Sequence, residues 1–154
     1  MKRSIFIDTD VVLDFLLDRE PFSTFASIIF SLSEEKEVKA YISPLTISNS
    51  YYILRKLASH TKVVKNLQKL LLITNITSIS KNDVALALNS NFTDLEDALQ
   101  HFSAISHAKV DVILTRNLKD YKHSEVPAMT PETYIKTRLI DPSAQQTLSR
   151  HARS

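Results

Sequence analysis

Carboxylates occur at three separate points of the chain where a metal-dependent enzyme would need them. Asp8 directly follows the apolar run of SIFID, Asp97 lies within FTDLEDALQ, and Asp120 follows the apolar run of VDVILTRNLKDY by a short turn. Carboxylates at the ends of strands and on one helix can meet at one edge of an α/β sheet, where their oxygens suit Mg²⁺ or Mn²⁺. The sequence therefore indicates an acidic site for a divalent metal.

Each acid also has an ordinary structural explanation. Asp8 could cap the helix that follows its strand. Asp94 and Glu96 suit the positive end of a helix, and Thr93-Asp94-Leu95-Glu96 matches a capping box that accounts for Glu96 without chemistry. Asp97 lies one turn into the same helix, so these effects explain it less well. We therefore expect Asp97 to be the functional acid of this helix and Glu96 to be structural.

Polar residues follow the apolar run near the end of the chain. Thr115, Arg116 and Asn117 come directly after it, and Asp120 comes three residues later. Hydroxyl, amide and carboxylate groups at such a point can hold water on a metal or contact phosphate. Asn and Asp are also ordinary turn residues, so a simple turn is the alternative.

Positive charge is concentrated in one part of the chain. The stretch 38–82 has no Asp or Glu but contains Arg55 and Lys56 beside Tyr51 and Tyr52, together with five more lysines. A basic surface beside an acidic pocket could hold a polyanion, and tyrosines could stack on its bases. The alternative is a solvated helix face with partly buried tyrosines.

Composition narrows the classes of function. The 154 residues suit one domain, and the net charge is only +2. The absence of cysteine excludes disulfides, zinc–thiolate sites and thiol nucleophiles, and it fits a reducing cytoplasm. The absence of glycine, where average usage predicts about eleven, excludes a nucleotide cofactor held by a glycine-rich loop. The apolar run of MKRSIFIDTD is too short for a signal peptide or membrane span, so we expect no membrane association.

The pattern along the chain alternates between strands and helices. Short apolar runs predict strands at 4–7, 39–42, 76–79, 110–114 and 126–129. Helices are expected between them, with starts marked by Ser43-Pro44, Ser80 and Pro131. Such alternation predicts a three-layer α/β/α domain over residues 1–140, with a central, mostly parallel sheet of four to five strands. Residues 141–154 are polar, and we expect a flexible tail there.

Four of these segments together resemble a known family, the PIN domain, a metal-dependent ribonuclease fold that includes the VapC-like toxins of bacterial toxin–antitoxin pairs. The resemblance runs from about Ser4 to Leu139. The strand and acids of IFIDTDVVLDFL are similar to the family's opening motif, ISPLTISNSYYILRK to its second, FTDLEDALQHFSA to its third and VILTRNLKDY to its fourth. The four segments occur in the family's order at suitable spacing.

The resemblance implies catalytic and metal-binding roles for five residues. Asp8 and Asp97 stand at the family's metal-binding acids, and Asp94 is a close neighbour that would share the metal. Asn117 and Asp120 stand in the fourth motif, where acids bind metal or orient water.

The resemblance also implies which residues would meet the substrate. Thr115 and Arg116 would steady the scissile phosphate, and Arg55 and Lys56 would hold the RNA backbone. Asn49 stands where many members carry Glu, so the second motif has lost its acid. In the opening motif, an aspartate at position 10 replaces the common Asn and adds an acid at the edge of the site.

The function implied by the resemblance is hydrolysis of RNA phosphodiester bonds with Mg²⁺ or Mn²⁺. The expected partners are RNA, an antitoxin protein and a second copy of the chain in a homodimer. One alternative is a PIN-like module that binds RNA or protein without cutting, because the acid at Asn49 is missing. Another is a phosphatase of the haloacid-dehalogenase type, with Asp8 as nucleophile and Asp10 as acid/base, although the late acidic pair of that family is poorly matched.

Overall fold

The computed structural model describes residues 2–140, so the predicted tail at 141–154 lies outside the described residues. The strands are β1 Arg3–Ile7, β2 Val38–Ile42, β3 Asn75–Ile76, β4 Val112–Leu114 and β5 Ala128–Met129. The α-helices are α1 Thr9–Leu16, α2 Ser23–Glu34, α3 Pro44–Leu54, α4 His60–Leu72, α5 Lys81–Leu88, α6 Leu95–Ser103 and α7 Pro131–Ile140. A π-helical turn, η1 (Ala104–Ala108), extends α6, and a 3₁₀ turn, η2 (Leu118–Tyr121), follows β4.

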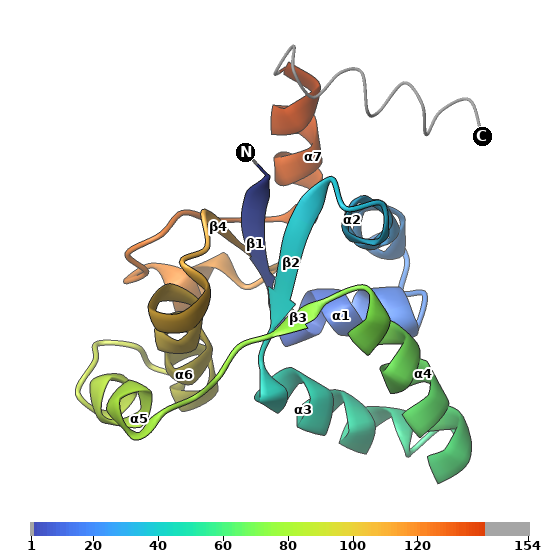
Figure 1. Cartoon of the computed structure of the whole chain (residues 1–154), viewed down its shortest axis with the longest axis horizontal. Helices are drawn as coiled ribbons and strands as arrows, with labels where there is room; N and C mark the ends of the chain where they lie inside the picture. The colour runs from blue at the N-terminus through green and yellow to red at the C-terminus, as the bar shows by residue number, and fades with distance from the viewer. Residues whose placement is uncertain (1, 141–154) are drawn as a thin grey trace.

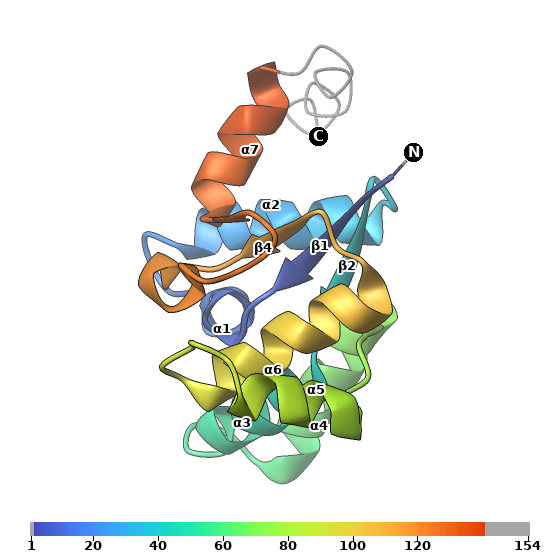
Figure 2. The ribbon, with the colours of Figure 1, turned by 90° about the vertical axis from the view of Figure 1, so that its left-hand side faces the viewer.

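The sheet has the order β3-β2-β1-β4-β5, and every neighbouring pair of strands is parallel. Helices α1, α2 and α4 lie on one side of it, and α5 and α6 lie on the other (Figures 1 and 2). This arrangement confirms the predicted three-layer α/β/α class with a parallel sheet. Crossovers between parallel strands place helices on both faces, which explains why the central strands are apolar throughout.

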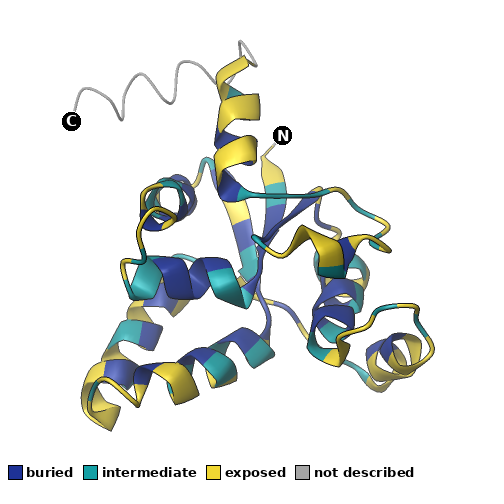
Figure 3. Ribbon diagram, turned by 180° about the vertical axis from the view of Figure 1, so that it is seen from behind, coloured by how far each residue is buried: buried dark blue, intermediate teal, exposed yellow. Residues whose placement is uncertain are grey.

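The core is divided by the sheet into two parts. Ile5 and Ile7 of β1 face the side covered by α1 and α2, whereas Phe6 faces the side of α6 and packs with Ile113 and Tyr121. This alternation follows from the two-residue period of a strand. Figure 3 shows burial concentrated on the strands and on the inner faces of the helices.

The carboxyl ends of β1 and β4 lie side by side, because Ile7 pairs with Leu114 in the parallel register. The backbone N–H of Asp8 continues the ladder by donating to the Leu114 carbonyl at 3.0 Å. Asp8 and Thr115 are therefore neighbours at one edge of the sheet. A crevice at this edge is the usual place for a site in a parallel α/β fold.

Two of the predicted helix starts have the expected caps. The Ser43 side chain accepts from the Thr46 N–H, with Pro44 in the first turn of α3. Ser80 forms a capping box with Asp83 at the start of α5. These side chains satisfy N–H groups that have no partner within the helix.

Several boundaries differ from the sequence prediction. Helix α3, which begins at the predicted start, ends at Leu54, where the chain turns and a further cap at Ser59 starts α4. Strand β3 covers only Asn75–Ile76 at the sheet edge, since Thr77 leaves β2 after one further hydrogen bond to the Ile42 carbonyl. Short apolar runs mark strands well, but pairing with a neighbour determines their length.

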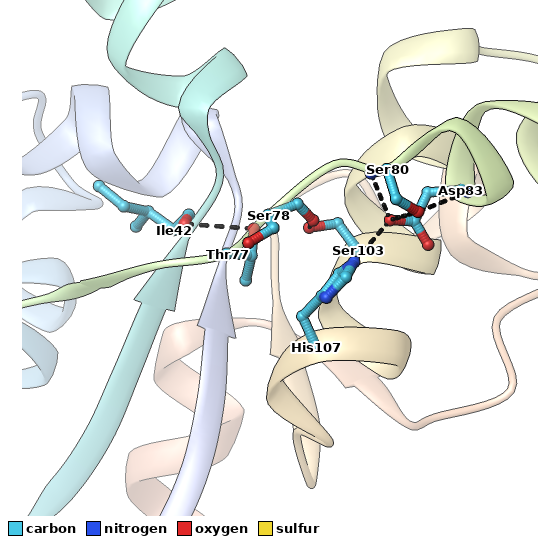
Figure 4. Close-up of polar contacts among 7 residues, drawn as sticks. All are labelled: Ile42, Thr77, Ser78, Ser80, Asp83, Ser103 and His107. Atoms are coloured by element: carbon cyan, nitrogen blue, oxygen red, sulfur yellow. Dashed lines mark hydrogen bonds and ion pairs between the residues drawn. The ribbon is translucent and has the colours of Figure 1, made fainter.

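A polar network holds α5 and α6 against the end of the sheet (Figure 4). The Ser103 hydroxyl donates to the Ser78 carbonyl at 2.7 Å, just after Thr77 leaves β2. Oδ2 of Asp83 accepts from Ser80 and lies 2.7 Å from Nε2 of His107 in η1. The C-terminal end of α6 is thereby fixed, and α6 also carries Asp97.

Within residues 2–140, three non-glycine residues adopt left-handed backbone conformations. They are Asp18, Lys36 and Lys109, with φ values of 51°, 61° and 48°. Asp18 and Lys36 follow the C-caps of α1 and α2, and Lys109 is the C-cap of η1. Glycine is the usual residue at such helix ends.

Candidate functional site

The predicted acids surround one pocket at the carboxyl edge of the sheet. Its volume is about 770 Å³. Six carboxylates line it, together with two asparagines and several other residues: Asp8, Asp10, Asp94, Glu96, Asp97, Asp120, Asn49, Asn117, Thr9, Arg19 and Tyr52. Elements far apart in the sequence thus contribute to a single acidic cavity, as the strand-end and helix positions led us to expect.

Asp8 lies at the base of this pocket, buried and only 5% exposed. Its Oδ1 accepts from the Thr9 N–H at 2.8 Å and from Gln100 Nε2 at 3.1 Å, and its Oδ2 accepts from the Thr115 hydroxyl at 2.8 Å. Burial raises the pKa of Asp8, and these hydrogen bonds act against that rise. Asp8 is the N-cap of α1 and is also held firmly in one orientation, so the two explanations of this residue are compatible.

Asp10 follows Asp8 in the sequence and lies in the first turn of α1. Its Oδ2 accepts from the Arg116 backbone N–H at 3.0 Å. Its Oδ1 is buried and has no hydrogen-bond partner among residues 2–140. Burial and the charge of Asp8 raise the pKa of Asp10 to about 6. An unpartnered carboxylate oxygen of this kind is a free acceptor for a cation or proton.

Asp97 is a second acid of the pocket whose pKa is strongly raised. It lies on α6, is 9% exposed, and accepts a long hydrogen bond of 3.4 Å from the Tyr121 hydroxyl. Burial and the charges of Asp8, Asp94 and Asp120 raise the pKa of Asp97 to about 8. The folded protein therefore favours a proton on Asp97 at neutral pH unless a cation compensates the surrounding charge.

The start of α6 differs from the sequence prediction. Asp94, not Thr93, is the N-cap, and its Oδ1 accepts from the Asp97 N–H at 3.0 Å. The predicted capping box of Thr93 and Glu96 is therefore wrong. Asp94 has a short side chain whose carboxylate oxygen can cap a helix as a Ser or Thr hydroxyl does, and it lies one residue later. Glu96 therefore stays in the first turn of α6 but takes no part in the cap.

Glu96 instead extends into the pocket toward α1 and α3. The Thr9 hydroxyl donates to its Oε1 at 3.4 Å, and Asn49 hydrogen bonds to its carboxylate. Burial raises the pKa of Glu96, and the charges of Asp8 and Asp94 raise it further against the effect of Asn49. Glu96, for which we predicted a structural role, thus lies beside Asn49 in the wall of the pocket.

The turn after β4 closes the opposite wall of the pocket. Asn117 donates from Nδ2 to Oδ2 of Asp120, and the Asn117 N–H donates to the Thr115 hydroxyl at 3.0 Å. Thr115 is fully buried, so its hydroxyl links the turn to Asp8 rather than facing the cavity. Asn117 and Asp120 line the pocket, and Thr115 supports it from below.

The predicted basic residues lie outside the pocket. The Arg116 guanidinium forms a bidentate ion pair with Asp14 at 2.7 and 3.0 Å and lies over the Phe22 ring at 3.9 Å. Arg55 and Lys56 are exposed at the end of α3, where Arg55 donates to the Ala58 carbonyl. The structure therefore does not bring these three side chains to the carboxylates.

Sequence reasoning missed several residues of the site. Gln100 and Tyr121 hydrogen bond to the acids from buried positions, and Arg19 lines the pocket wall. Gln100 lies three residues after Asp97, so the helical period offered a signal for it. Arg19 follows the end of α1 in a turn, and nothing in its sequence context distinguishes it from a solvated arginine.

Comparison with known proteins assigns the fold. Residues 4–119 match the PIN domain. The chain belongs to the PIN-domain family. No curated protein sequence matches it.

Solved structures share the fold of this PIN domain at low sequence identity. VapBC2 from Rickettsia felis, bound to a promoter DNA fragment, has 17% identity and a TM-score of 0.60 over 82% of this chain and 98% of its own. VapBC-1 from nontypeable Haemophilus influenzae has 12% identity and a TM-score of 0.62 over 84% and 98%. FitAcB from Neisseria gonorrhoeae has 16% identity and a TM-score of 0.58 over 83% and 98%.

The pocket of this PIN domain fits a hard divalent cation by its chemistry. Its donors are oxygens, the acids repel one another, and Oδ1 of Asp10 is buried without a partner among the described residues. Among residues 2–140, no three acidic or histidine side chains are arranged to hold a metal ion as they stand. Binding a cation therefore requires the repelling carboxylates to draw together.

The described part of the chain has no helix that is both long and apolar enough to cross a membrane.

Proposed function

We propose that this PIN-domain protein is a ribonuclease that depends on Mg²⁺ or Mn²⁺ and acts as the toxin of a toxin–antitoxin pair. The observation that carries the proposal is the pocket of six carboxylates at the sheet edge, with the pKa of Asp97 raised to about 8 and that of Asp10 to about 6. A cation relieves such repulsion without protonating the acids.

In this proposal Asp8, Asp97 and Asp94 hold the metal. A bound ion would supply a nucleophilic water at neutral pH and would offset charge on the phosphate. Thr115 and Gln100 do not touch RNA; they hold the Asp8 carboxylate in one orientation through hydrogen bonds of 2.8 and 3.1 Å. Positioning of this kind lowers the cost of organising the site during reaction.

The reaction is hydrolysis of a phosphodiester. The water oxygen forms a bond to phosphorus, the bond from phosphorus to one ribose oxygen breaks, and that oxygen leaves with a proton. Asn117 and Asp120 line the pocket where they would orient the water. The proposed substrate is single-stranded RNA or a loop, because unpaired nucleotides can be splayed into a cleft.

Exposed basic residues beside the pocket would hold the rest of the RNA. Arg55 and Lys56 are exposed, and Tyr52, which is 69% exposed, also lines the pocket. Reversing both charges with Arg55→Glu and Lys56→Glu should weaken RNA binding and flatten its dependence on salt, because fewer counterions are released. Binding isotherms at several salt concentrations measure this slope, and an unchanged slope assigns both residues to solvent.

A protein partner is proposed because the structural neighbours are toxin complexes and because this chain has an apolar groove. The groove, of about 560 Å³ between α3 and α4, is lined by Ile47, Tyr51, Leu67 and Leu71 among others. Exposed apolar surface of this kind marks a site of association. An antitoxin or a second copy of the chain could cover it.

The direct test is cleavage of a labelled single-stranded RNA by the purified protein. Cleavage should occur in Mg²⁺ or Mn²⁺ and stop in excess EDTA, and a DNA oligonucleotide of the same sequence tests the preference for RNA. If well-folded protein cuts no RNA in either metal, the loss of the acid at Asn49 has left a module that binds without cutting.

A further inference from the structure

The pocket lacks an acid at one position and has an unassigned acid beside it. Asn49, on α3, occupies the place where the PIN resemblance led us to expect Glu. Glu96 lies in the first turn of α6 but does not cap it, because Asp94 caps that helix through the Asp97 N–H at 3.0 Å. Both side chains line the pocket, and hydrogen bonding from Asn49 acts to lower the pKa of the Glu96 carboxyl.

Contacts from two other elements fix the Glu96 carboxylate in this place. The Thr9 hydroxyl lies 3.4 Å from its Oε1, and the same hydroxyl is 2.9 Å from that of Thr46 on α3. Glu96 is therefore connected to the first turns of both α1 and α3, although it belongs to α6. A glutamate that served only the dipole of α6 would not need these long-range contacts.

We propose that Glu96 supplies, from α6, the metal-facing carboxylate that position 49 lacks, and that Asn49 holds this carboxylate over the pocket. The proposal rests on the proposed function. It assigns Asn49 a positioning role. In this view the site has not lost an acid, because Glu96 takes the place of the acid that position 49 lacks.

The chemistry of the two residues supports this exchange. The Asn amide can donate a hydrogen bond to a carboxylate, whereas a Glu at position 49 would place a seventh negative charge against Glu96. A neutral Asn49 is thus compatible with a charged Glu96, whereas two negative charges at these positions would repel each other. The exchange keeps the number of carboxylates available to a cation.

The experiment uses the full chain and four variants. Glu96→Gln removes the charge at nearly constant size, and Asn49→Glu with Glu96→Gln moves the charge back to α3. Glu132→Gln is the matched control, since Glu132 lies in the first turn of α7 and is half exposed beside Lys136. Asp8→Asn reports on the proposed metal site itself.

Two readouts are measured: affinity for Mn²⁺ by titration calorimetry, and the unfolding temperature in EDTA. Glu96→Gln should weaken Mn²⁺ binding about tenfold, and the double variant should recover most of this loss. Glu132→Gln should bind like wild type. In EDTA, Glu96→Gln should unfold at the same or a higher temperature than wild type, because removing its charge relieves repulsion.

The outcomes separate the inference from the proposed function. If Glu96→Gln binds Mn²⁺ as tightly as Glu132→Gln, or if the double variant recovers nothing, the relocation of the acid is overturned. A lower unfolding temperature in EDTA with unchanged Mn²⁺ affinity would assign Glu96 a structural role. If wild type itself binds no Mn²⁺ and cuts no RNA, the proposed function fails and the inference fails with it.

Discussion

Two buried aspartates on the same side of the sheet behave in opposite ways. Asp83, at the start of α5, is fully buried, and Asp97, on the neighbouring α6, is 9% exposed. The pKa of Asp83 lies below its usual value, whereas that of Asp97 rises to about 8. Burial alone therefore does not decide which acid is suited to chemistry.

The difference lies in the groups that surround each carboxylate. Burial tends to raise the pKa of Asp83, but hydrogen bonds from the Ser80 N–H, from His107 and from the Ser80 hydroxyl outweigh it. Asp97 has one long hydrogen bond from Tyr121 and faces the charges of Asp8, Asp94 and Asp120. The donors around Asp83 thus stabilise its charged form, whereas the acids around Asp97 leave its charge uncompensated and available for a cation.

The largest expected effect is a loss of catalysis when Asp8 is changed, because its charge acts on Asp97 in the same pocket. Asp8→Asn keeps the size of the side chain and removes its charge, so RNA cleavage should fall by about a hundredfold to a thousandfold or more. Circular dichroism should show an unchanged fold. The unfolding temperature in EDTA should stay close to that of wild type, because relief of repulsion offsets the weakened hydrogen bonds to Asp8. Near wild-type cleavage by this variant would mean that the pocket is not the active site.

The second effect is a loss in the free energy of unfolding when Asp83 is changed. Asp83→Asn replaces an acceptor of three hydrogen bonds and should cost about 1–3 kcal/mol at pH 7. Because the folded pKa of Asp83 is lowered, its charge stabilises the protein above the unfolded value of 3.8, and this contribution is lost as pH falls through the folded pKa.

Urea titrations of wild type and Asp83→Asn at pH 7 and in acid measure this loss. The difference between the two proteins should shrink as the pH falls. RNA cleavage per folded molecule should change little, since Asp83 does not line the pocket of carboxylates. Equal stability at pH 7 would contradict the contrast drawn between the two aspartates.

The third effect is a pH dependence of opposite sign at the acidic pocket. The folded pKa values of about 8 for Asp97 and about 6 for Asp10 exceed the unfolded value of 3.8, so the folded state binds more protons between these limits. In EDTA, stability should therefore decrease as pH rises from about 4 to about 8. Saturating Mn²⁺ should reduce this decrease, because the cation replaces the protons.

Thermal unfolding across this pH range, with and without Mn²⁺, gives the measurement. Asp97→Asn is the control, and it should show a shallower decrease in EDTA than wild type. A stability that rises steadily from pH 4 to 8 in the absence of metal would show that the carboxylates do not repel one another in the folded protein.

The smallest effect should follow from removing one donor of Asp83. His107→Gln shortens the reach to Asp83 Oδ2, which lies 2.7 Å from Nε2 in the native protein. The loss should be about 0.5–1.5 kcal/mol in the free energy of unfolding at pH 7, and smaller than that of Asp83→Asn. Combining both substitutions should cost less than the sum, because they remove the same interaction.

Strand ends and helix caps made much of the fold predictable from the sequence. Asp8 after Ile5–Ile7 and the polar turn after β4 indicated the edge where the site lies, since the period and parallel order of strands bring such ends together. The start of α4 was not predicted, because the signal of Ser59 as a cap is no stronger than that of any other serine.

The roles of individual side chains were harder to predict. Glu96 fitted a capping box in sequence, and only the position of Asp94 shows that the helix does not use it. Arg116 looked available for phosphate, yet Asp14 lies one turn below on α1 and pairs with it. In both cases the role depends on a contact in the folded structure, namely the Asp94 cap and the Arg116–Asp14 ion pair, which the sequence around the residue does not specify.

The helix ends at Asp18 and Lys36 have a consequence for the unfolded chain. A left-handed residue with a side chain costs about 1 kcal/mol relative to glycine, and this protein accepts that cost at three positions. In return, a chain of 154 residues without any glycine has fewer conformations to lose when it folds. Local strain in these turns is thus offset by a lower conformational entropy of the unfolded chain. The stability of Lys36→Gly relative to wild type would show which of the two effects is larger.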